Sequence, residues 1–130
     1  MKILSAAVLV ALCLAAPFSA FAQRVTRAIV AARLQPSHLT LELTENVLMD
    51  RVDGAVVTLT RLRELGVGLS IDDFGTGYSS LSYLSSLPID SLKIDASFVR
   101  GMRNGSKEAE VVRAIVTLGA SLGKSVIAEG

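Results

Sequence analysis

Residues 69–80 read LSIDDFGTGYSS, and the interpretation of the rest of the chain depends on this stretch. Its apolar and β-branched residues favour a strand that ends at Asp72 and Asp73. Adjacent carboxylates at a strand end repel each other unless a cation lies between them. Gly75 and Gly77 allow the backbone to turn tightly beside that charge. An ordinary acidic turn has the same features, so the choice depends on the neighbouring strands.

Three further segments alternate apolar and polar residues as strands do, over residues 39–44, 91–95 and 125–128. Apolar residues at helical spacing predict helices between the strands, over residues 25–34, 53–65, 78–87 and 108–122. This alternation predicts successive βαβ units and a parallel sheet. The predicted fold class is therefore α/β, a partial (β/α)8 TIM-type barrel of about four parallel βα units, since a complete barrel needs ~250 residues.

The first three predicted strands each keep one polar or small face, which would point inward if the sheet curls into a barrel. Seven charged residues lie near the predicted strand ends: Glu42, Glu45, Asp72, Asp73, Lys93, Asp95 and Glu129. Carboxylate oxygens suit Mg²⁺ or Mn²⁺, and two such ions could activate a water and stabilise the leaving oxygen of a phosphodiester. The alternative is a set of solvated acids paired with lysine.

Composition limits the other function classes. The chain has 130 residues, a formal net charge of +1 and 51% hydrophobic residues, which is typical of one globular domain. It contains no basic run, so we expect no nucleic-acid polymer as a partner. Cys13 is the only cysteine, which excludes a disulfide within one chain.

The N-terminus has the layout of a secretory signal peptide. Lys2 precedes an apolar run, and Ala20-Phe21-Ala22 is a small-residue cleavage pattern before Gln23. We therefore expect a signal peptide or membrane anchor over residues 1–22, a partial barrel domain over residues 23–130, and export to the periplasm.

Two alternatives to a cleaved signal stay open. Residues 3–22 form an uncharged segment of about the ~20 residues that span a bilayer, which predicts an N-terminal hydrophobic helix and membrane association. Arg24, Arg27 and Arg33 would then keep the domain in the cytoplasm, at the inner membrane. A gene fusion or gene-calling artefact is the other alternative.

Four motifs of the chain resemble successive motifs of the EAL-domain family. They are LELTE at 41–45, DDFGTGYSS at 72–80, LKID at 92–95 and AEG at 128–130, and the resemblance runs from about Val25 to Gly130. Members of that family are cyclic-di-GMP phosphodiesterases, built as (β/α)8 barrels, that linearise the dinucleotide with magnesium or manganese. The resemblance implies the same fold, substrate and metal dependence for this chain.

The resemblance also implies residue roles. Glu42 and Asp72 would be metal ligands, and Asp73 would complete the second metal site. Lys93 would hold or polarise the attacking water. Asp95 would support that region, and Glu129 would serve the metal and water cluster. Glu45 would anchor a loop that shapes the substrate site and a dimer contact, formed by Phe74, Gly75, Thr76, Gly77, Tyr78 and Ser79.

The chain also departs from the family pattern. The Glu-Ala-Leu signature strand, the next strand with its asparagine, and the final strand with its glutamine are absent, and Ala96 replaces a common arginine. We therefore expect impaired metal binding and a chain that is inactive or weakly active alone. Loss of a group that only supports a metal ligand already lowers metal affinity or activity about 10- to 100-fold. The alternatives are a degenerate module that binds cyclic-di-GMP or pairs with a complementing barrel half, and a truncated gene product.

Overall fold

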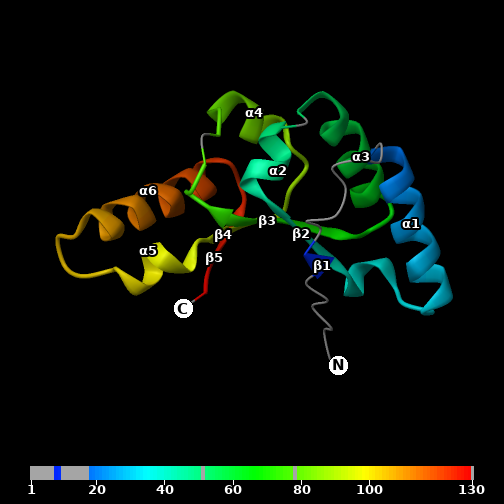
Figure 1. The fold of residues 1–130 in the computed structure, drawn as a ribbon, viewed down its shortest axis with the longest axis horizontal. Helices are drawn as coiled ribbons and strands as arrows, with labels where there is room; N and C mark the ends of the chain where they lie inside the picture. The colour runs from blue at the N-terminus through cyan, green and yellow to red at the C-terminus, as the bar shows by residue number, and fades with distance from the viewer. Residues whose placement is uncertain (1–7, 10–17, 51, 78, 130) are drawn as a thin grey trace.

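Five parallel strands form one sheet in the order β1-β2-β3-β4-β5 (Figure 1). The computed structural model describes residues 8–9, 18–50, 52–77 and 79–129. The strands are β1 (Val8–Leu9), β2 (Thr40–Thr44), β3 (Gly68–Phe74), β4 (Ser91–Ile94) and β5 (Ser125–Ala128). The helices are α1 (Phe18–Ala31), the 3-10 helix η1 (Pro36–His38), α2 (Glu45–Asp50), α3 (Val52–Glu64), α4 (Leu81–Ser86), α5 (Ala96–Arg100) and α6 (Lys107–Ser121).

One face of the sheet is apolar and packs against the helices. Leu41, Leu69 and Leu92 occupy it on three neighbouring strands, and each is fully buried. Burial of a leucine side chain contributes about 1.5–3 kcal/mol, so this face supplies most of the hydrophobic stabilisation. The same core contains Leu43, Leu48, Leu59, Leu62, Ile71, Leu84, Ile94 and Ile115.

The other face of the sheet carries polar side chains that are also buried. Glu42, Ser70, Ser91 and Lys93 alternate with the core residues along β2, β3 and β4, as the pleat of a strand requires. Buried polar groups need hydrogen-bond partners. In the described ranges, every buried side-chain nitrogen and oxygen has one. The polar face is therefore a buried layer whose polar groups are hydrogen-bonded within the fold.

The predicted α/β fold and its four predicted strands are confirmed. The sequence does not predict β1, because Val8 and Leu9 lie inside the apolar segment for which we expect a helix. They instead pair with Leu41 and Glu42 of β2. The expected N-terminal hydrophobic helix over residues 3–22 is therefore not supported, although residues 3–7 and 10–17 of that segment lie outside the described residues.

Helix α1 begins earlier than the predicted helix and spans the expected cleavage position between Ala22 and Gln23. Its buried stripe repeats every four residues at Phe21, Val25 and Ile29, and it packs beside α3 (Figure 1). None of the helices in the described ranges is both long and apolar enough to cross a membrane.

Asp90 joins the amino ends of three strands. Its Oδ2 accepts a hydrogen bond from the backbone N–H of Leu69 at 2.8 Å. Its own backbone N–H donates to the Leu69 carbonyl at 2.8 Å, and its carbonyl accepts from the N–H of Ser125 at 3.0 Å. On the exposed side, Oδ1 lies 3.5 Å from the Arg63 guanidinium.

We predict that Asp90→Ala lowers the free energy of unfolding by about 1–3 kcal/mol, because the partly buried N–H of Leu69 loses its acceptor. Arg63→Ala removes only the exposed ion pair and is expected to cost under about 1 kcal/mol. Urea unfolding followed by circular dichroism measures both variants. Equal losses in the two would show that the Asp90 carboxylate does not support Leu69.

Candidate functional site

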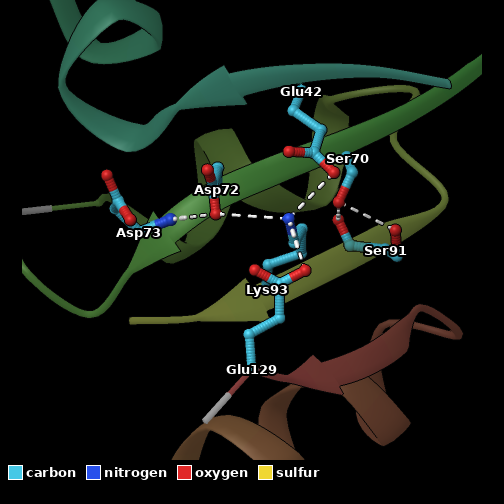
Figure 2. Close-up of polar contacts among 7 residues, drawn as sticks. All are labelled: Glu42, Ser70, Asp72, Asp73, Ser91, Lys93 and Glu129. Carbon is cyan, nitrogen blue, oxygen red and sulfur yellow. Dashed lines mark hydrogen bonds and ion pairs between the residues drawn. The ribbon is translucent and has the colours of Figure 1, made fainter. Parts of the chain in front are cut away.

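The charged residues of the polar face meet at the carboxyl ends of the strands, around the ammonium group of Lys93 (Figure 2). Lys93 Nζ lies 2.8 Å from Glu42 Oε1, 2.9 Å from Glu129 Oε1 and 3.7 Å from Asp72 Oδ1. These acids come from β2, from the residue after β5 and from β3. The structure therefore brings together four of the residues that the sequence predicts for the site.

Burial makes these contacts matter. The Lys93 and Glu42 side chains are only 7% and 8% exposed, whereas that of Glu129 is 60% exposed. Burial works to lower the pKa of Lys93, but hydrogen bonds to Glu42 and Glu129 and the charge of Asp72 outweigh it, so the pKa is raised. Lys93 is therefore a permanent cation at physiological pH.

A bulge in β3 places two acids opposite this one lysine. β3 and β4 pair at Ile71 with Leu92 and next at Phe74 with Ile94, with a register shift between them. Asp72 and Asp73 therefore both lie opposite Lys93. Asp73 has a left-handed backbone (φ 54°), and its N–H donates to Asp72 Oδ1 at 3.0 Å. Bulges of this kind redirect side chains next to active sites.

Asp73 and Asp95 have opposite electrostatic environments. Burial, followed by the charges of Asp72 and Asp95, raises the pKa of Asp73. Asp95 is the N-cap of α5: its Oδ1 accepts hydrogen bonds from the hydroxyl of Ser97 and, at 2.8 Å, from the Ser97 N–H. These bonds lower the pKa of Asp95. Asp95 is thus bonded to its own helix rather than to Lys93.

The residues fit the chemistry of a divalent ion but not, as folded, its geometry. Carboxylate oxygens are the ligands that Mg²⁺ and Mn²⁺ prefer. Within the part of the chain that the structure describes, however, no three acidic, histidine or cysteine side chains gather where they could share an ion. Glu42, Asp72 and Glu129 instead converge on Lys93, which already supplies a positive charge.

Glu45 anchors the loop that follows β3. It lies in the first turn of α2 and is 2% exposed. Its Oε2 accepts hydrogen bonds from the backbone N–H groups of Gly75 and Gly77 at 3.1 and 2.9 Å, and its Oε1 accepts one from the hydroxyl of Ser79. One buried carboxylate therefore satisfies three donors of the loop.

The loop leaves little room for a side chain at either glycine. Gly75 has φ 104°, and a Cβ there would lie 2.9 Å from the ring of Phe98. A Cβ on Gly77 would lie 2.8 Å from Asn46 Oδ1.

The other predicted loop residues are distributed differently. Phe74 belongs to β3 and is buried in the core, so it does not line the loop. The Thr76 hydroxyl donates to the Asp73 carbonyl at 2.8 Å, which ties the loop to the bulge. Tyr78 lies outside the described residues.

A buried pair of serines, which the sequence does not predict as part of the site, lies beside the charged residues (Figure 2). The Ser91 hydroxyl donates to Ser70 Oγ at 2.9 Å, and Ser70 in turn donates to the Ser91 carbonyl at 3.3 Å (Figure 2). The two serines precede Asp72 and Lys93 by two residues, so they share their face of the sheet. This spacing is the signal that could have predicted them.

Comparison with known sequences gives one consistent family. The family model of the EAL domain matches residues 9–130. MucR of Pseudomonas aeruginosa, a bifunctional diguanylate cyclase/cyclic di-GMP phosphodiesterase, is 49% identical over 106 residues, 82% of this chain and 16% of that protein. NbdA of the same organism, a cyclic di-GMP phosphodiesterase, is 48% identical over 106 residues, 82% of this chain and 14% of that protein.

Solved structures give the same result. The PaMucR phosphodiesterase in its c-di-GMP complex is 46% identical with a TM-score of 0.82, over 88% of this chain and 52% of that chain. A manganese/cy-diGMP complex of Klebsiella pneumoniae BlrP1 is 35% identical with a TM-score of 0.73, over 83% of this chain and 28% of that chain. The chain thus spans about half of the first of these structures.

We predict that Glu45→Ala lowers the free energy of unfolding by at least about 2 kcal/mol, because three loop donors lose their acceptor. Hydrogen exchange at the Gly75 and Gly77 amides should also become faster. Glu45→Gln retains one oxygen and should have a smaller effect. Asp50→Asn, at the exposed end of the same helix, is the control. Unchanged exchange in Glu45→Ala would refute the anchoring role.

Proposed function

This chain belongs to the EAL domain family, and we propose that its site binds cyclic-di-GMP and hydrolyses it weakly with Mg²⁺ or Mn²⁺. One observation carries the proposal: Glu42, Asp72, Lys93 and Glu129 converge at the carboxyl ends of the strands. Barrel enzymes place their catalytic groups at this end. The related PaMucR phosphodiesterase, whose fold superposes with a TM-score of 0.82, has been solved with c-di-GMP bound.

The contacts of Lys93 support weak rather than full activity. A lysine ammonium has three N–H donors. Glu42 and Glu129 accept two of them, and Asp72 lies within 3.7 Å. Lys93 therefore has little capacity left to hold a water or a phosphate oxygen. A metal ion on these carboxylates would also compete with Lys93 for their oxygens.

A second function, binding without hydrolysis, is favoured by a specific observation. No three potential metal ligands gather within the described ranges, while the hydrogen bonds that hold the loop to Glu45 use none of the acids around Lys93. A module of this kind would sense cyclic-di-GMP or associate with another protein. We propose a homodimer, or pairing with a complementing barrel half, as the form that such association takes.

We predict that the full chain binds cyclic-di-GMP and turns it over slowly with Mg²⁺ or Mn²⁺. Turnover should stop in EDTA and fall at least about 10- to 100-fold in Asp72→Asn, because this is the range found even for groups that only support metal ligands. Calorimetry measures binding, chromatography measures the linear dinucleotide, and Asp50→Asn is the control.

Two other outcomes of that experiment are distinct. Binding without turnover would support the second function, and absence of binding would refute both hydrolysis and sensing of cyclic-di-GMP. Light scattering on the same samples would show the mass of two chains if the homodimer forms.

For the location of the chain we propose export directed by residues 3–22, with anchoring at the membrane as the alternative. The support is Lys2 followed by an uncharged apolar segment. The pairing of Val8–Leu9 with β2 adds a physical cost to cleavage, because removal of residues 1–22 would remove β1.

We predict that N-terminal sequencing of the mature protein gives Gln23 if the chain is exported. An intact Met1 would contradict cleavage and support the anchor. Fractionation of the same cells into membrane and soluble material would then separate the anchor from a chain that keeps residues 1–22 as part of its domain.

A further inference from the structure

We propose that Lys93 is the resident cation of the carboxylate group, and that divalent ions must compete with it for Glu42, Asp72 and Glu129. This inference rests on the proposed metal dependence of the site. It concerns how readily the metal enters, which the family assignment does not state.

The first support is the convergence of the acids. Glu42, Asp72 and Glu129 come from three different elements, yet all point toward the one Nζ atom (Figure 2). Acids that lie this close repel one another unless a positive charge lies among them. Lys93 supplies that charge from β4.

The second support is burial. The side chains of Glu42 and Asp72 are 8% and 17% exposed, so water does little to screen them. A buried carboxylate is tolerated only when it is paired. Glu42 Oε1 is already 2.8 Å from Lys93 Nζ. A divalent ion on that oxygen would lie close to the ammonium charge, and the two cations would repel each other.

The third support is that the acids are not arranged to share a metal ion. Within the described ranges, no three of them gather where they could share an ion, although their oxygens are suitable ligands. The acids are arranged around an ammonium group. A metal ion would therefore have to share these acids with Lys93, which already holds one oxygen of Glu42, and the Lys93 ion pairs would lower the affinity for the metal.

The test removes the charge while keeping the length of the side chain. Lys93→Met is unbranched and neutral. Lys93→Arg keeps the charge, and Lys107→Met removes a lysine charge from the exposed start of α6. Binding of Mn²⁺ alone is measured by calorimetry on the full chain, without dinucleotide. Thermal unfolding is measured once with EDTA and once with about 10 mM Mg²⁺.

We expect Lys93→Met to melt at a lower temperature in EDTA, because Glu42 loses its partner. We expect it to bind Mn²⁺ at least about tenfold more tightly. A change of this size lies within the range of metal affinities altered by groups that act through metal ligands. Added Mg²⁺ should raise its melting temperature more than that of the unmodified chain. Lys93→Arg and Lys107→Met should bind Mn²⁺ like the unmodified chain.

Unchanged or weaker Mn²⁺ binding in Lys93→Met would overturn the proposal. If this variant is unfolded in EDTA, refolding on addition of Mg²⁺ would support the proposal and failure to refold would overturn it. An equal gain in Lys107→Met would also overturn it, because net charge would then explain the effect. Failure of the unmodified chain to bind cyclic-di-GMP would be a separate result. It would refute the proposed function, and the Mn²⁺ comparison would still be interpretable.

Discussion

The ion pairs of Lys93 with Glu42 and Glu129 allow a buried, charged layer to exist on one face of this sheet. An unpaired carboxylate at the position of Glu42 would cost several kcal/mol in a protein interior. Lys93 comes from β4, while Glu42 lies on β2 and Glu129 follows β5. The ion pairs therefore reach across the sheet and connect strands that do not all pair directly. They add side-chain links at the carboxyl ends, where Asp90 does not reach.

The bulge in β3 decides which acids meet Lys93. With regular alternation, Asp72 and Asp73 would point to opposite faces of the sheet. The register shift instead places both opposite one residue of β4, and Asp73 adopts a left-handed backbone (φ 54°). Aspartate tolerates this conformation better than most residues, yet it still stores some strain. The strain lies beside the most acidic part of the site, where geometry matters most for binding a cation.

Much of this arrangement follows from the sequence, for physical reasons. Strand period and helix period predict the sheet and its polar face, because burial acts on every residue of a regular element. Irregular features are harder to predict. The bulge at Asp72 depends on pairing between strands, and the short strand β1 depends on an edge that β2 offers. The cap at Asp95 could have been predicted, since aspartate directly before a helix is a common N-cap.

The sequence does not predict the partner of each charged side chain. Glu42 and Glu45 are three residues apart, and both are buried. Glu42 follows the pleat of β2 and meets Lys93, whereas Glu45 begins α2 and turns toward the loop after β3. Two similar acids thus belong to two separate networks. Which network each one joins depends on where β2 ends and α2 begins.

This separation has a consequence for function. The loop after β3 is held by Glu45 through backbone hydrogen bonds that do not involve Lys93. The acids around Lys93 would have to rearrange to accept an ion, but the loop would not. A ligand that contacts mainly the loop would therefore meet a surface that is already formed, and would pay little ordering entropy. The proposed hydrolysis would carry the added cost of the competition between the metal and Lys93. If the proposed function holds, binding would thus persist under conditions, such as low metal concentration, in which the chemical step does not.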